Sequence, residues 1–408
     1  MIDFNSILEK EETLDPENWE GMKQLAHTMV DDMFDYLKNL KNEKVWQKTP
    51  EETKTHLAQQ LPQQGESIEK VYADFKQNIL PFKKGNNHPR FWSWVQGQGT
   101  PFAMMAEMLA AGMNPNVAIG DHAAMYVDAQ VIEWIKEMLN FPKSGSGILL
   151  SGGSMANNTA MLIARNAYQN QTVRKEGLKS VAQMKVYITS ETHSCIQKAV
   201  EVAGLGSDAL HVVKTNADFR MNVDDLKNCI AADRAKGFIP LCVVGNAGTV
   251  NTGAIDPLDE ILEICARENI WFHVDGAFGA LAKLVDEYKD ALKAIEKADS
   301  VALDLHKWMY MPYEIGCLLV KNKGAEKNIT IVGYQATITD SSGKTYKGIS
   351  VEIGGRIDRY NTVKVAPEID YEAIITFENI PEGVRKVQVL SMPFESKTVN
   401  LRNITISN

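Results

Sequence analysis

The chain has 408 residues, of which 44% are hydrophobic and 23% charged, and its formal net charge is -9. This length suggests two or three domains, each with its own core. The acidic balance argues against a nucleic-acid partner, because such partners are bound through clustered Lys and Arg. Neither end carries an apolar run long enough to span a bilayer.

Two further features of the composition indicate a cytoplasmic protein. The start of the chain is acidic, with Glu9-Lys10-Glu11-Glu12, where a secretory signal would be basic and then apolar. The five cysteines are scattered and have no close-paired spacing, so we expect reduced thiols and no metal site.

Residues 1–80 are predicted to form a helical arm. Its apolar residues recur at helical spacing, as in Met22, Leu25, Met29 and Met33. Asp15-Pro16-Glu17 predicts a helix that begins there, with Asp15 as N-cap and Pro16 in the first turn. A breaker-rich stretch over 81–101 follows and holds Phe91, Trp92 and Trp94. These aromatic residues are a candidate pocket wall, although packing in a core is their commoner use.

The middle of the chain alternates short apolar runs with segments of helical spacing. The runs predict strands over 147–150, 186–189, 211–213, 241–244, 270–274, 300–303 and 317–320. Helices are predicted over 131–139, 156–168 and 255–267. This alternation predicts an α/β domain with a mainly parallel sheet and right-handed crossovers.

After residue 324 the pattern changes to strands that alternate with turns. Strands are predicted over 328–339, 348–353, 362–365, 373–377 and 386–390, with a turn over 340–343. Period-two strands at short intervals are typical of an antiparallel sandwich. We therefore predict an N-terminal helical arm over 1–80, a large α/β domain over 81–323 and an all-β, sandwich-like module over 325–408.

A glycine-rich turn is the first candidate for ligand chemistry. Gly152-Gly153-Ser154 lies between a predicted strand and a predicted helix. A helix N-terminus after such a turn offers backbone N–H groups and a favourable dipole to a phosphate. Taken alone, a Gly-Gly-Ser sequence is more often an ordinary turn.

Asp275 and Lys307 are the second pair of candidates. Asp275 ends a predicted strand, where ligands of α/β proteins bind, and its carboxylate suits a pyridinium nitrogen. Lys307 follows the next strand and has an amine that can form a Schiff base with an aldehyde. The commoner uses of such residues are a turn aspartate and a solvated lysine, but Trp308 to Met311 make the lysine segment unusually apolar.

Two more polar segments follow predicted strands. His193 is placed to lie over an aromatic ring, although a structural histidine is the commoner role. The loop over 245–256, with Thr249, suits either a polar loop or a pocket edge. The phosphate turn, histidine, threonine loop, aspartate and lysine thus all follow strands, and their joint order is what favours a pyridoxal 5'-phosphate site.

With these segments the chain resembles the group II pyridoxal-phosphate-dependent amino acid decarboxylases, which include aromatic-L-amino-acid decarboxylases. The resemblance spans residues 15 to 323 and is specific in three segments: Asn246-Ala247-Gly248-Thr249, His273-Val274-Asp275-Gly276-Ala277 and Asp304-Leu305-His306-Lys307-Trp308. It implies a fold-type-I transferase-like domain, pyridoxal 5'-phosphate as cofactor and decarboxylation of an L-amino acid to an amine and CO₂.

The resemblance also implies roles for particular residues. Lys307 would form the Schiff base, Asp275 would pair with the pyridine nitrogen and His193 would cover the ring. Gly153 and Ser154 would bind the phosphate, Ala277 would pack on the ring, and Thr249 and His306 would line the pocket. The helical arm would wrap a second copy, so the resemblance implies a homodimer.

The C-terminal part departs from the family's pattern. No counterpart of the family's later large-domain segments, mobile-loop tyrosine or small domain is recognisable in 325–408, where Tyr334, Tyr346, Tyr360 and Tyr371 lie among predicted strands. We therefore expect a decarboxylase domain that is truncated and joined to a β-rich segment, which would lose active-site closure. The alternatives are an impaired decarboxylase-like protein with a binding module, or transamination with the same cofactor.

Overall fold

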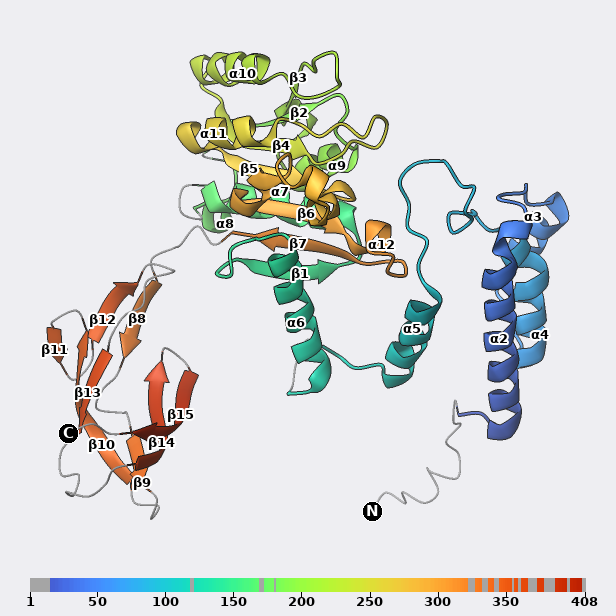
Figure 1. Cartoon of the computed structure of the whole chain (residues 1–408), viewed down its shortest axis with the longest axis horizontal. Helices are drawn as coiled ribbons and strands as arrows, with labels where there is room; N and C mark the ends of the chain where they lie inside the picture. The colour runs from blue at the N-terminus through green and yellow to red at the C-terminus, as the bar shows by residue number, and fades with distance from the viewer. Residues whose placement is uncertain are drawn as a thin grey trace.

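The computed structural model describes residues 15–117, 121–168, 172–179 and 181–321, and beyond these only the eight strands β8 to β15. The chain begins with an arm of helices and ends with a β-rich module, and an α/β domain lies between them in sequence (Figure 1). None of the described helices is both long and apolar enough to cross a membrane.

The N-terminal arm is helical, as predicted. It contains α2 (Trp19–Asn39), α3 (Glu51–Leu57) and α4 (Ile68–Asp74), with short turns η1 (Leu40–Asn42), η2 (Phe75–Ile79) and η3 (Leu80–Phe82). Helices α2 and α4 lie side by side (Figure 1), and Asp32 on α2 accepts hydrogen bonds from Tyr72 Oη and Lys76 Nζ, both at 2.7 Å.

The predicted start of the first helix is wrong. Helix α2 begins at Trp19, and its N-cap is Asn18, whose Oδ1 accepts a hydrogen bond from the Gly21 N–H at 2.9 Å. Asn caps helices as well as Asp does, so Asn18 fills the position that the sequence pattern assigned to Asp15. Pro16 consequently lies outside the helix.

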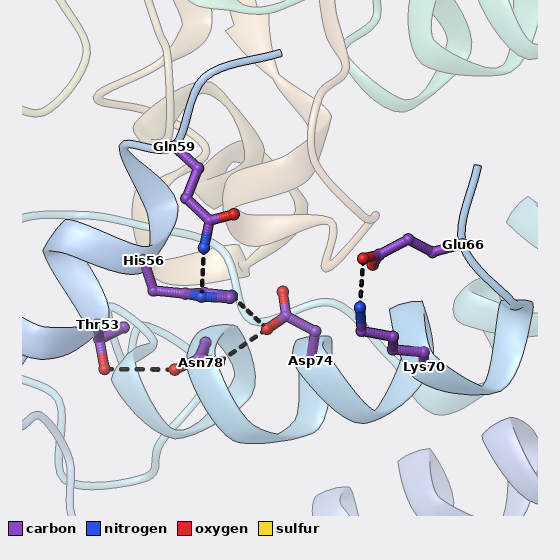
Figure 2. Close-up of polar contacts among 7 residues, drawn as sticks. All are labelled: Thr53, His56, Gln59, Glu66, Lys70, Asp74 and Asn78. Carbon is purple, nitrogen blue, oxygen red and sulfur yellow. Dashed lines mark hydrogen bonds and ion pairs between the residues drawn. The ribbon is translucent and has the colours of Figure 1, made fainter. Parts of the chain in front are cut away.

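A polar network joins α3 to α4 and η2 (Figure 2). His56 Nε2 lies 2.5 Å from Asp74 Oδ1, and Gln59 Nε2 lies 2.8 Å from His56 Nδ1. Asn78 donates to the same Asp74 oxygen at 2.8 Å and accepts from Thr53 Oγ1 at 3.4 Å. Because the Gln59 amide donates to Nδ1, the neutral His56 ring carries its proton on Nε2 and donates it to Asp74.

The central domain is built on a seven-stranded sheet in the order β1-β7-β6-β5-β4-β2-β3. The strands are β1 (Ser146–Leu150), β2 (Met184–Thr189), β3 (Leu210–Val213), β4 (Ile239–Asn246), β5 (Trp271–Asp275), β6 (Ser300–Asp304) and β7 (Gly316–Val320). Strand β7 is antiparallel to both β1 and β6, and the other pairings are parallel. All seven strands predicted from the sequence are confirmed, as is the mainly parallel sheet.

Helices cover both faces of this sheet. One face packs against α6 (Ala123–Met138), α10 (Val223–Ala235) and α11 (Leu258–Glu268), and the other packs against α7 (Gly153–Ala167) and α9 (Cys195–Val202). The remaining helical elements are α5 (Pro101–Met113), α8 (Thr172–Glu176), α12 (Leu305–Trp308), η5 (Ser207–Ala209), η6 (Gly279–Leu284), η7 (Asp286–Tyr288) and η8 (Lys293–Lys297). Strands β5 and β6 are buried at every position, as continuous apolar strands in a covered sheet should be.

The C-terminal strands pair only in antiparallel fashion, as predicted. They are β8 (Lys327–Ile331), β9 (Thr337–Asp340), β10 (Thr345–Ile353), β11 (Arg356–Asp358), β12 (Asn361–Val365), β13 (Ala373–Phe377), β14 (Lys386–Phe394) and β15 (Lys397–Thr405). The strand predicted over 328–339 is described only at its two ends, and most of the predicted turn after Asp340 lies outside the described residues. Strands β11 and β15 were not predicted.

Of the four C-terminal tyrosines, Tyr346 alone lies within the described residues. Tyr334, Tyr360 and Tyr371 lie outside the described residues, and the backbone of Tyr346 lies in β10.

Candidate active site

One cavity of about 660 Å³ gathers every site residue predicted from the sequence. Its lining includes Gly153, Ser154, His193, Thr249, Asp275, Ala277, His306 and Lys307. These residues follow the carboxyl ends of β1, β2, β4, β5 and β6, which meet at one edge of the sheet. The cavity therefore lies where ligands bind in open α/β sheets.

The glycine-rich turn after β1 leads into the N-terminus of α7. Gly152 has φ 154° and ψ 175°, a backbone conformation that is essentially restricted to glycine. A β-carbon on Gly153 would lie 2.7 Å from Asp304 Oδ2, so this position also requires glycine. No side chain among the described residues caps α7, which leaves backbone N–H groups of its first turn available to an anion.

Lys307 lies on the short helix α12 and is held by an acidic neighbour. Its Nζ atom is 2.9 Å from Asp304 Oδ2, and its side chain is 21% exposed. Asp304 is almost fully buried, and its second carboxylate oxygen has no hydrogen-bond partner in the described part of the chain. The lysine thus lies at the cavity wall with its amine oriented by a buried carboxylate.

Asp275 ends β5 as a buried carboxylate. Its Oδ1 accepts a hydrogen bond from the Ala277 N–H at 3.2 Å. Burial raises the pKa of Asp275, while Lys307 acts in the opposite direction. A buried carboxylate is stabilised by a cationic ligand group.

Two histidines reach the cavity with fixed rings. The Cys195 N–H donates to His193 Nδ1 at 3.2 Å, so the neutral His193 ring carries its proton on Nε2. The Ile315 N–H donates to His306 Nδ1 at 3.1 Å, and the His306 ring lies 4.3 Å from the Tyr313 ring. Burial lowers the pKa of His306.

The breaker-rich stretch supplies part of the cavity wall. Trp94 lines the cavity, whereas Phe91 and Trp92 do not, and Trp92 is 90% exposed. The Lys84 ammonium lies 5.1 Å from the centre of the Trp94 ring. The Gly97 N–H donates to Tyr313 Oη at 2.8 Å, which joins this stretch to the loop after Lys307.

The threonine loop after β4 is fixed by a buried aspartate. Asp256 accepts hydrogen bonds from the backbone N–H groups of Asn246 and Met221, both at 2.7 Å. Thr249 Oγ1 lies 2.6 Å from Thr252 Oγ1 within the loop. Gly248 has φ 91°, and a β-carbon there would lie 2.8 Å from the Phe278 ring, so only glycine fits.

Sequence reasoning missed several residues of this cavity. Asn157, Glu191, Asp304 and Tyr313 line it but received no predicted role. Asn157 had a readable signal, because it shares a helical face with Ala160 and Ala164, which are buried against the sheet. A polar residue on such a face needs a partner in the core.

Comparison with known proteins agrees with this geometry. Residues 50–340 match the model of the pyridoxal-dependent decarboxylase conserved domain. The chain belongs to this family. Pyridoxal 5'-phosphate, the cofactor predicted from the sequence, is therefore confirmed.

Relatives from this family are similar over much of the chain. An aromatic-L-amino-acid decarboxylase from Bacillus atrophaeus is 34% identical over 306 residues, which cover 74% of this chain and 62% of that protein. Tryptophan decarboxylase 2 from Oryza sativa is 29% identical over 320 residues, covering 77% and 64%. The chain thus spans less than two thirds of the length of these curated relatives.

Solved structures show the same fold. The structure of Catharanthus roseus tryptophan decarboxylase in complex with L-tryptophan is 27% identical, with a TM-score of 0.69 over 75% of this chain and 67% of that one. A glutamate decarboxylase domain from Vibrio parahaemolyticus gives a TM-score of 0.67 at 27% identity, over 75% of this chain and 68% of that one. The predicted fold-type-I architecture is confirmed.

The cavity fits the cofactor group by group. The uncapped N-terminus of α7 suits its phosphate, and the Gly152-Gly153 turn leaves room for one. The buried carboxylate of Asp275 suits a protonated pyridine nitrogen. The Lys307 amine lies on the wall of the same cavity, where it can reach the aldehyde.

Proposed function

We propose that the protein decarboxylates an L-amino acid to the amine and CO₂ with pyridoxal 5'-phosphate as cofactor. The observation that carries this proposal is that Lys307, Asp275 and the α7 N-terminus line one cavity. Each of these three groups matches a different part of the cofactor. Membership of the pyridoxal-dependent decarboxylase family supports the reaction class.

Each site residue takes the role that its position allows. Lys307 binds the cofactor aldehyde, Asp275 binds the ring nitrogen and keeps it protonated, and His193 covers the ring face. Gly153 and Ser154 bind the phosphate, Ala277 packs on the ring, and Thr249 and His306 line the pocket. When bound, the cofactor supplies a ring that accepts the electron pair left on the α-carbon as CO₂ departs.

Asp275 sustains this chemistry because of where it lies. A buried carboxylate interacts strongly with a cation, so it holds a proton on the ring nitrogen across the neutral pH range. The Ala277 N–H orients its Oδ1. His193 is in turn held by the Cys195 N–H, which prevents rotation of its ring away from the cavity.

An aromatic amino acid is the proposed substrate class. Trp94 lines the cavity and presents a large apolar ring beside it. The Bacillus relative is named an aromatic-L-amino-acid decarboxylase and the Oryza relative a tryptophan decarboxylase.

Absorbance spectroscopy tests cofactor binding first. Wild type with pyridoxal phosphate should show a visible band that is lost in Lys307→Ala and kept in Lys289→Ala, an exposed lysine outside this cavity. Wild type is then incubated with each protein amino acid, and amine and CO₂ are quantified. A visible band without amine from any amino acid would contradict decarboxylation.

The products also separate the competing activities. A relative that is 31% identical over 320 residues is named phenylacetaldehyde synthase, from Petunia hybrida, so an aldehyde is a specific alternative product. Transamination would give a keto acid instead. Cofactor binding without turnover would favour an impaired decarboxylase-like protein with a β-rich binding module.

We also propose a homodimer and the division of the chain into an arm over 1–80, a cofactor domain over 81–323 and a β module over 325–408. Large hydrophobic side chains are exposed on α2, α5 and α6: Trp19, Met29, Phe34, Phe102, Met108, Leu109, Met113, Tyr126, Val127 and Trp134. Exposed apolar residues on three helices are typical of an interface. Sedimentation velocity should give twice the mass of one chain, and a monomer at micromolar concentration would contradict the dimer.

A further inference from the structure

A chain of four buried side chains runs behind Asp275 and has no role in the function proposed above. Trp271 Nε1 donates to Ser300 Oγ at 2.8 Å, and Ser300 Oγ lies 2.8 Å from His273 Nδ1. His273 Nε2 lies 2.7 Å from Asn157 Oδ1. These residues come from β5, β6 and α7, and three of them are at most 1% exposed.

The chemistry of the groups fixes the direction of every hydrogen bond. An indole N–H only donates, so Ser300 Oγ accepts from Trp271 and its own hydrogen is free for His273 Nδ1. An amide oxygen only accepts, so His273 carries its proton on Nε2 and donates it to Asn157 Oδ1. Burial holds the pKa of His273 at about 3, so the ring is neutral and Nδ1 is an acceptor.

Asn157, the last of these four hydrogen-bonded residues, lines the active-site cavity and presents a donor there. With Oδ1 engaged by His273, the Asn157 amide presents Nδ2, which donates to Cys195 Sγ at 3.4 Å. Asn157, Cys195 and Asp275 all line the same cavity, so this donor lies on the Asp275 side of the network. In agreement with that placement, the Asn157 side chain lowers the pKa of Asp275, against the larger effect of burial. Were the amide reversed, Asn157 would present an oxygen instead of a donor to this part of the cavity.

We propose that Asn157 is a positioning residue for Asp275, and that the chain from Trp271 through Ser300 and His273 fixes the orientation of its amide. The donor so presented keeps Asp275 ionised, and the ionised Asp275 keeps the ring nitrogen of the cofactor protonated. This proposal rests on the proposed function for its effect on the cofactor, but the chain of hydrogen bonds exists in the protein alone.

Other titratable groups near Asp275 act on the same carboxylate and must be held constant. Lys307 and His193 both lower the pKa of Asp275. The Cys195 thiol faces Asp275 and Asp304, and burial raises its pKa to about 12, so it stays neutral. The variants proposed below leave all four of these residues in place.

The tautomer of His273 is the first test, and it requires no cofactor. Nitrogen NMR of wild type labelled with ¹⁵N-histidine distinguishes a protonated from an unprotonated ring nitrogen, and a His273→Gln spectrum assigns the signal. The expected result is a neutral His273 with its proton on Nε2 throughout the neutral range. A proton on Nδ1 would reverse the Asn157 amide and overturn the proposal.

The second test measures the effect on the cofactor. Asn157→Leu and Ser300→Ala are compared with wild type and with Asn158→Leu, a neighbouring asparagine outside the cavity lining. Loss of a hydrogen bond to a charged group should weaken pyridoxal phosphate binding by about tenfold in Asn157→Leu. Ser300→Ala should have a smaller effect, and Asn158→Leu should bind as wild type does.

The protonation of the bound cofactor separates positioning from a structural role. With ring-¹⁵N pyridoxal phosphate, wild type and Asn158→Leu should show a protonated ring nitrogen, and Asn157→Leu a shift toward the neutral form. An unchanged nitrogen shift in both Asn157→Leu and Ser300→Ala would overturn the proposal, even if their melting temperatures fell. Failure of wild type to bind the cofactor would contradict the proposed function instead, and the tautomer test would still decide the inference.

Discussion

Helix α2 and strand β5 are held in the fold by different means. None of the 21 residues of α2 is buried, whereas all five residues of β5 are. The helix depends on its Asn18 cap, on polar contacts such as those of Asp32 with α4, and on whatever covers its exposed aromatic side chains. Most helical stability in proteins comes from tertiary packing. Because α2 buries no residue, a substitution in the arm removes much less packing energy than a substitution in the sheet.

This contrast predicts that the sheet domain tolerates little change near its site while the arm tolerates much. The cavity belongs to the buried sheet region, because its residues follow buried strands. Substitutions there should therefore change stability, cofactor binding or both. Substitutions in the arm should affect stability only slightly.

The largest effect is expected for Gly97→Ala. A β-carbon there would lie 1.4 Å from the His306 carbonyl oxygen, so the cavity wall and the Lys307 segment must move apart. We expect a loss of about 3 kcal/mol in the free energy of unfolding, measured by urea denaturation. Gly112→Ala is the matched control, because a β-carbon there meets nothing within 4 Å in helix α5. It should stabilise by about 0.5 to 1 kcal/mol, and equal losses in both variants would refute the close-packing account.

Acidification is expected to weaken the sheet domain through His273. Burial lowers the pKa of this histidine from 6.5 to about 3, so the folded state holds it neutral. Its contribution to stability is complete above pH 6.5 and is lost progressively as the pH falls toward 3. Lowering the pH from 6.5 to 5 should cost wild type about 2 kcal/mol more than His273→Gln. Parallel pH profiles of the two proteins, measured without cofactor, would show that His273 is not the cause.

Asp275→Asn should separate stability from binding. The pKa of Asp275 is raised in the fold, so its contribution to stability is present at low pH and lost as the pH rises through the folded value. At neutral pH the ionised carboxylate destabilises the cofactor-free protein. Its removal should raise stability on the order of 1 kcal/mol and weaken pyridoxal phosphate binding. A lower melting temperature without cofactor would contradict this sign.

The smallest effect is expected in the arm, for Asp74→Asn. This carboxylate is exposed, and its pKa is lowered by hydrogen bonds from Asn78 and His56. The stabilisation is present at neutral pH and is lost on acidification through the folded pKa. Exposed ion pairs contribute little, so the melting temperature should fall far less than in Gly97→Ala. A comparable fall would mean that the α3 to α4 network in Figure 2 is essential to the arm.

The sequence predicted the sheet and the site residues well because their signals are local. Buried strands such as β5 read as continuous apolar runs, and each site residue follows such a run. The N-cap of α2 was misplaced because Asp15 and Asn18 are both good caps within a few residues. Strand β7 was located, but its antiparallel direction was not, because direction depends on the strands that it pairs with.

The site residues that escaped prediction act through contacts distant in sequence. Asn157 hydrogen-bonds to His273, and Tyr313 accepts a hydrogen bond from the Gly97 N–H, in both cases across many intervening residues. A short window of sequence can indicate that such a residue needs a partner, as it does for Asn157, but it does not identify the partner. Asp304 was visible in the lysine motif, but its ion pair with Lys307 follows from the turn of α12 rather than from composition.

The position of β1 at the edge of the sheet has a consequence for the order in which the protein matures on the ribosome. Strand β1 pairs only with β7 in this sheet. Its residues, such as Ser146, therefore have no strand partner until the ribosome has synthesised β7 through Val320. The turn at Gly152 follows β1 and packs against Gly316. A nascent chain that has not yet released β7 therefore lacks support for the α7 end of the cavity, where we propose that the phosphate binds, and we expect cofactor binding to follow synthesis of the whole sheet.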